Sequence, residues 1–238
     1  LSYYNLRVEN SGTKQLRTSD ATTFIVLNDL TITNGAALSL NSQNLEVQHS
    51  WLNAVAGSTF LPGTNSVIFR SIINDPLAPV TVTVRDTAQN PFHHVVVAGI
   101  GYTKPSDNWK VRGNFTIESG SKFIMGTATP TTLSLEGNWT NLGGTFTAGK
   151  STVRFDGTAT QFLSKVSGNA LFYNLVVNNP NSVNANSVGT LVGDNGVYID
   201  SLGSITLQNG NLITRSRYLS MHPNASLVRS GATAGHID

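Results

Sequence analysis

Apolar residues recur along the chain in i, i+2 pairs that are separated by short polar stretches. Leu30/Ile32, Leu38/Leu40 and Ile205/Leu207 are examples. In an extended strand, alternate side chains point to the same face, so each pair predicts a short, half-buried strand. No window shows the i, i+3, i+4, i+7 spacing of an amphipathic helix. We therefore expect an all-β protein with almost no helix.

The spacing of these pairs separates two β architectures. Leu30 to Leu38 is 8 residues and Leu38 to Leu45 is 7, with an Asn34-Gly35 turn between the first two strands. β-Sandwich repeats usually carry longer strands at intervals of about 8–12 residues. Three sides of seven or eight residues instead give a coil of about 20–24 residues, at the short end of repeat periods. The spacing favours a parallel β-helix (β-solenoid), with β-sandwich repeats as the alternative.

A longer period overlies the short one. Similar segments begin at Tyr3, Phe92 and Phe172, and His49–Asn53 matches Gly137–Asn141. These matches define imperfect long repeats over 3–91, 92–171 and 172–238, the last of them truncated, and we expect about four coils in each. We interpret 1–238 as a single β-solenoid segment of a larger protein.

Several motifs carry a family resemblance. They are Phe-Tyr-Asn-Leu-Val-Val-Asn-Asn at 172–179, Gly-Asn-Trp-Thr-Asn at 137–141 and Thr-Val-Arg-Phe-Asp-Gly-Thr at 152–158. The chain resembles the repeats of large bacterial surface and exported proteins of the autotransporter-like, filamentous-haemagglutinin-like and gliding-bacteria types, most clearly over 113–179. The resemblance implies a right-handed parallel β-helix, a location at the cell surface or outside the bacterial cell, and a scaffold role rather than a reaction.

Composition narrows the classes of partner. The 238 residues include no cysteine, which gives no basis for a disulfide framework or a thiolate metal site. Net charge is only +2 and the basic residues are scattered, so we expect no nucleic-acid partner. No apolar run is long enough for a membrane helix, and we expect no membrane insertion of this segment.

Candidate catalytic groups are sparse. Glycoside hydrolysis needs two carboxylates about 5–10 Å apart, and only Asp194/Asp200 and Glu118/Glu136 suggest a pair. The sequence favours solvated single charges as the explanation of both. On a strand, His93 and His94 would point to opposite faces and make a poor metal site. Asp194-Asn195-Gly196 is at most a weak calcium turn. We predict no catalytic, cofactor-binding or metal-binding residues, no cofactor, and no enzymatic activity.

Two tryptophans are the remaining candidates for ligand contact. Trp51 and Trp139 recur at one position of the long repeat, where each is a structural corner residue or a platform on which a sugar stacks. The sequence favours a structural or adhesive segment of a bacterial cell-surface or extracellular protein; the alternative is a carbohydrate-active enzyme or carbohydrate-binding module. Expected partners are further copies joined end to end, other surface proteins, or glycans.

Overall fold

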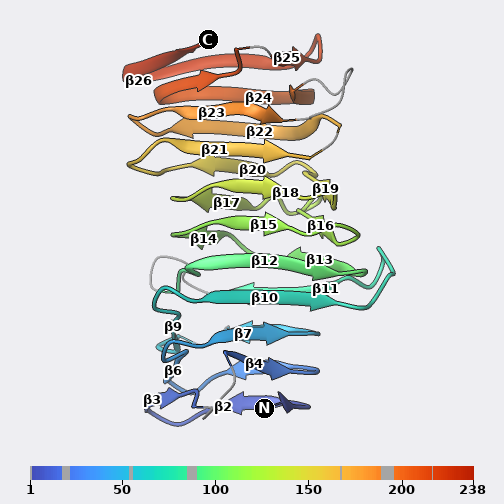
Figure 1. Cartoon of the computed structure of the whole chain (residues 1–238), viewed down its shortest axis with the longest axis vertical. Coiled ribbons are helices and arrows are strands. Elements are labelled where there is room, and N and C mark those ends of the chain that lie inside the picture. Colours follow the sequence, from blue (N-terminus) through green and yellow to red (C-terminus); the bar gives the residue numbers. More distant parts are fainter. Residues whose placement is uncertain are drawn as a thin grey trace.

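The computed structural model describes residues 2–17, 22–53, 56–84, 90–166, 168–188, 196–215 and 217–238. Within these ranges every regular element is a β-strand, and the strands pair in parallel. The chain rises as a stack of coils from the N-terminus to the C-terminus (Figure 1). This arrangement confirms the β-solenoid prediction. It excludes the β-sandwich alternative, because the sheets of a sandwich are antiparallel.

Each coil crosses three faces in turn, here named A, B and C. Face A holds β1 (Ser2–Tyr3), β4 (Thr23–Val26), β7 (Asn44–Val47), β10 (Ser66–Ser71), β12 (His94–Gly99), β15 (Phe115–Ile117), β18 (Trp139–Asn141), β21 (Gln161–Lys165) and β23 (Val183–Val188). Face B holds β2 (Leu6–Val8), β5 (Leu30–Ile32), β8 (Trp51–Asn53), β11 (Val80–Val84), β13 (Tyr102–Pro105), β16 (Lys122–Ile124) and β19 (Thr145–Thr147). Face C holds β3 (Gly12–Gln15), β6 (Ala36–Ser39), β9 (Thr59–Leu61), β14 (Trp109–Val111), β17 (Thr132–Leu135) and β20 (Thr152–Phe155).

Near the C-terminus single strands are longer and continue from one face of the coil to the next. β22 (Ala170–Asn178) covers the B and C positions, and β24 (Gly196–Ile213) continues round to pair with Val183 on face A. The top of the stack is β25 (Tyr218–Met221) and β26 (Ser226–Ile237), which both pair with β24.

Register partners on face A give the length of each coil. Phe115 pairs with Val95 at an interval of 20 residues, and Leu163 pairs with Trp139 at an interval of 24. These intervals match the predicted coil length. The coil that starts at Val67 is longer, because Val67 pairs with Val95, 28 residues on. Part of this extra length is the loop 72–79 between β10 and β11.

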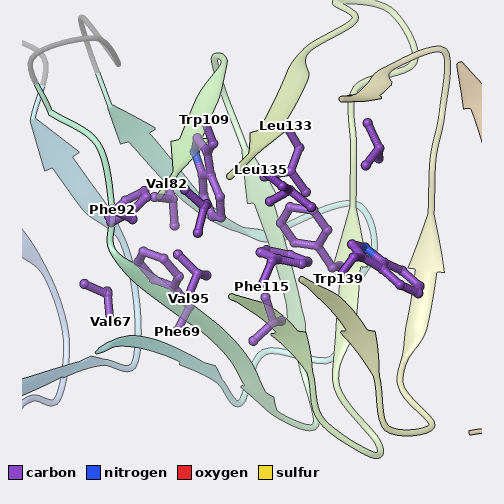
Figure 2. Packing of buried hydrophobic residues seen from close by; sticks show 14 of the residues in the cluster. Val67, Phe69, Val82, Phe92, Val95, Trp109, Phe115, Leu133, Leu135 and Trp139 are labelled. Carbon is purple, nitrogen blue, oxygen red and sulfur yellow. The ribbon is translucent and has the colours of Figure 1, made fainter. Parts of the chain in front are cut away.

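The core is a set of inward columns that run up the stack. Val67, Val95, Phe115, Trp139 and Leu163 form one column on face A, and each is at most 1% exposed. Figure 2 shows Val67, Val95, Phe115 and Trp139 of this column in the interior, together with side chains of faces B and C. Parallel strands about 4.8 Å apart place like side chains directly above one another, which suits branched and aromatic residues. The i, i+2 pattern of the sequence is the source of these columns.

The long repeat does not advance by whole coils. Tyr3 lies in β1 on face A, Phe92 bridges to Val111 of face C, and Phe172 lies in the face-B part of β22. In the described residues eleven strands, β1 to β11, precede Phe92, which makes three coils and two further faces. The interval is therefore one face short of four coils, close to the expected number of about four coils.

Candidate functional site

The two candidate tryptophans are core residues. Trp51 is 1% exposed in β8 on face B, and Trp139 is 0% exposed in β18 on face A. Trp51 packs edge-on against Phe60 with ring centroids 4.8 Å apart, and Trp139 packs in the same way against Phe172 at 5.5 Å. Neither ring presents a face to solvent. The sugar-stacking interpretation is wrong for both, because each indole fills the space inside its coil.

The paired histidines are closer than strand alternation predicts. The rings of His93 and His94 lie 4.3 Å apart between centroids, and a Cβ atom added to Gly113 would lie 2.5 Å from Nδ1 of His94 and 3.0 Å from Nδ1 of His93. The expectation that they face opposite ways is wrong, because β12 begins only at His94 and strand alternation does not reach His93. Among the described residues no group of three or more His, Cys, Asp or Glu side chains is placed to hold a metal ion.

His94 is part of a ladder at the corner before face A. Its Nδ1 accepts the N–H of Asn114 at 2.9 Å. Burial, and secondarily the charge of His93, lower the pKa of His94. At the same corner of other coils an asparagine Oδ1 accepts the N–H of the next coil: Asn44 from Ser66 (3.0 Å), Asn114 from Asn138 (3.0 Å) and Asn138 from Phe162 (2.8 Å). We call this set the corner ladder; it is structural.

The carboxylates on the outer surface are mostly occupied by cations. Glu136 and Asp156 lie on adjacent coils of face C, a pairing that the sequence did not reveal. Lys110 Nζ lies 2.8 Å from Glu136 Oε1, and Arg154 Nε lies 2.6 Å from Asp156 Oδ1. Asn178 Nδ2 donates a further hydrogen bond to Asp156 Oδ1 at 2.9 Å. The arrangement is a surface ladder of ion pairs rather than a pair of free carboxylates in a cleft.

Of the carboxylate pairs considered from the sequence, the Glu118/Glu136 pair is split between two faces. Glu118 follows β15 on face A and Glu136 follows β17 on face C. Asp194, proposed both as a partner of Asp200 and as part of the calcium turn, lies outside the described residues. Asp107 is the carboxyl group whose pKa is raised, by burial, and its Oδ1 accepts the N–H of Val84 at 3.0 Å.

A groove crosses face B and is the best candidate for a ligand site. Its volume is about 530 Å³. The floor is Thr81 of β11 with Lys104, Pro105 and Ser106 of the next coil. The walls are two loop segments, Leu77–Pro79 before β11 and Gly126–Thr129 after β16. We call this the face-B groove.

Both walls of the face-B groove are held by side chains of neighbouring coils. Lys122 Nζ donates to Oδ1 of Asn74 (2.8 Å) and to the carbonyl of Ile100 (2.7 Å), which fixes the loop that carries Leu77. Ser151 Oγ donates to the carbonyl of Gly126 (2.9 Å) and accepts the N–H of Thr131 (2.9 Å), closing the base of the second loop. The walls are therefore preorganised.

Two other hollows are less informative. One, of about 440 Å³, is the underside of the first coil and is lined by core side chains such as Leu6, Val8 and Phe24. The other, of about 390 Å³, lies between Tyr198 of β24 and Tyr218 of β25. Neither combines a charged group with walls built from loops on both sides.

Comparisons with known proteins give no relative. A scan against protein-family models, a search of curated proteins and a search of solved structures each found no match. The resemblance to bacterial surface repeats therefore rests on the sequence motifs alone. In the described part of the chain, no helix is long and apolar enough to cross a membrane.

Proposed function

We propose that this chain is a rigid structural or adhesive segment of a bacterial cell-surface or extracellular protein. The observation that supports the proposal is the single apolar core shared by all three faces over the nine stacked strands of face A. Each coil packs only on its neighbours, so stability and stiffness accumulate along the stack. These nine strands span eight steps of about 4.8 Å, and β24 and β26 add two further steps above β23, so the stack forms a rod of roughly 50 Å.

The outer surface fits this role better than it fits catalysis. Glu46, Glu136 and Asp156 each lie in an ion pair with a lysine or arginine. The pairs Glu46–Arg70 and Glu136–Lys110 each join two neighbouring coils, whereas Asp156 pairs with Arg154 of its own coil. The proposal assigns no catalytic residue, cofactor or metal. Its expected partners are further copies joined end to end, other surface proteins, and glycans.

The test asks where the protein lies in or on the cell and whether it is part of a larger assembly. Antibodies raised against the purified chain are used for immunogold labelling of cells that produce it, and the labelled material is viewed by electron microscopy. The proposal predicts label outside the cell on fibres, rods or a layer. Label confined to the cell interior, or only on separate particles unattached to any surface structure, would contradict it.

A carbohydrate-binding module is the second candidate, and the face-B groove is the observation that favours it. The groove combines hydroxyl groups, apolar surface and one cation on a rigid scaffold. Ligand sites are usually concave, largely preformed, and about 300–1,000 Å³ in volume.

A further inference from the structure

We propose that the face-B groove binds a segment of a carboxylated polysaccharide, with Lys104 as the residue that receives the carboxylate. The proposal rests on the carbohydrate-binding candidate above and names its ligand class, and it does not depend on whether the rod is a scaffold.

Charge is the first argument. Among the described residues that line the groove, Lys104 is the one charged side chain, and it is half-buried. Within the described residues its ammonium group makes no hydrogen bond or ion pair, whereas Lys110 on the same coil and Lys122 on the next coil both have partners. A partly desolvated cation without a counter-charge gains most from an anionic ligand, since charge-assisted hydrogen bonds are about twice as strong as neutral ones.

The remaining lining fits a sugar chain. Thr81, Ser106, Thr127 and Thr129 supply hydroxyl groups along the floor and one wall. Ala78, Pro79, Ala128 and the 93% exposed Leu77 supply apolar surface at the same level. A uronic acid has hydroxyls, C–H faces and one carboxylate per residue, so it matches all three kinds of surface.

The backbone of the floor argues against a peptide. β11 pairs with β8 on one side and with β13 on the other, and β13 pairs with β11 and β16. Among the described residues at the floor, only the two-residue strand ends Val80–Thr81 and Lys104–Pro105 lack a register partner on one side, and an extended peptide that adds to a sheet needs an open strand edge along its length. Side chains therefore supply most of the recognition in the groove, which suits a saccharide.

The walls explain why such a ligand would bind without large rearrangement. Lys122 and Ser151 hold the two loops from adjacent coils, as described above. Asp75 Oδ1 also accepts the N–H of Leu77 at 2.9 Å, which fixes the turn that presents the leucine. A preformed site loses less conformational entropy when the ligand binds.

The experiment is titration calorimetry of the purified chain with oligomers of galacturonate and of mannuronate, and with neutral dextran oligomers of equal length. We expect binding of at least one uronate and not of dextran, and a fall in affinity of about tenfold or more for Lys104→Gln. Arg112→Gln removes one exposed charge from face C and serves as the matched control. Its affinity should stay within about twofold of the unmodified chain.

Three results would overturn the proposal. One is that neither uronate binds the unmodified chain. Another is that Lys104→Gln and Arg112→Gln weaken binding equally, which would indicate attraction to overall charge. The last is that polyglutamate competes at equal affinity, which would favour an acidic protein partner.

Ser151→Ala, checked by circular dichroism for retained fold, should weaken uronate binding because it loosens the wall formed by Gly126–Thr129. A negative binding result leaves the immunogold test of the rod untouched, so the two failures are distinguishable.

Discussion

Truncation of Phe92 is the sharpest test of the packing between coils. Phe92 is 0% exposed, and its ring lies 5.6 Å from Trp51, 5.8 Å from Phe60, 5.6 Å from Phe69 and 5.3 Å from Trp109, centroid to centroid. It therefore joins aromatic side chains from three successive coils, and Figure 2 shows it beside Phe69 and Trp109.

The expected magnitude follows from these contacts. Phe→Ala in a core destabilises by about 3–5 kcal/mol, and well-oriented aromatic pairs add about 0.5–1.5 kcal/mol each beyond their burial. Four such neighbours put Phe92→Ala near the upper end, at about 4–5 kcal/mol. At about 2–4 °C per kcal/mol for a chain of this size, the melting temperature should fall by roughly 8–20 °C.

The assay is thermal and urea unfolding followed by circular dichroism, with hydrogen exchange to locate the loss. Phe162→Ala is the matched control, because Phe162 is 43% exposed; it should change the free energy of unfolding by less than about 1 kcal/mol. Since each coil contacts only its neighbours, exchange should rise first in β8–β14. Equal destabilisation by the two variants, or uniform loss of protection along the chain, would refute the reasoning.

Three further predictions concern the corners and the buried polar groups. The pKa of His94 is lowered in the folded chain, so the unfolded chain takes up the proton more readily and the free energy of unfolding should fall as pH drops below about 6.5. His94→Asn keeps an acceptor for the Asn114 N–H and should reduce this pH dependence in urea titrations at pH 5 and 8. An unchanged pH dependence would contradict the assignment to His94. Gly210→Ala should destabilise more than Gly35→Ala, because both have positive φ (+76° and +70°) but only at Gly210 would a Cβ atom meet a backbone oxygen, at 1.8 Å; equal melting temperatures would count against this contact. Gln161→Ala should lose about 2–4 kcal/mol, because its buried amide donates to two carbonyls and accepts from Gly157 N–H and Asn179 Nδ2; a loss below about 1 kcal/mol would show that water replaces the amide.

The fold was predictable from the sequence because each strand and turn of a solenoid produces a short repeat of apolar and polar residues. Leu30/Ile32 and Leu38/Leu40 alternate as inward residues of β5 and of the β6 segment, and the seven-to-eight-residue spacing sets the coil. Local patterns of this kind depend on backbone geometry alone. The face on which a strand lies depends on the number of all strands before it. The sequence therefore predicted about four coils for each long repeat but not that the interval of eleven strands is one face short of four coils.

Side-chain roles were harder to predict, because they depend on contacts about 20 residues or more away. Trp51 and Trp139 were ambiguous, since an indole at a repeat position looks the same whether it faces in or out. The corner ladder had a signal that was missed: asparagine stands directly before the strand in Asn114-Phe115 and Asn138-Trp139. The face-B groove had no such signal, because its lining comes from three successive coils.

The most direct test of the rigid rod is a set of distances measured by pulsed electron spin resonance. The chain has no cysteine, so nitroxide pairs can be placed cleanly. Ile25, Thr116, Thr140 and Ser164 lie in one outward column of face A, with Thr116, Thr140 and Ser164 four, five and six coils above Ile25. Cysteine pairs from Ile25→Cys to each of the other three should give narrow distributions whose means rise by about 4.8 Å per coil, from about 19 to about 29 Å between backbones. Distances that do not increase in this order, or broad distributions at all three, would contradict the stacked, rigid solenoid.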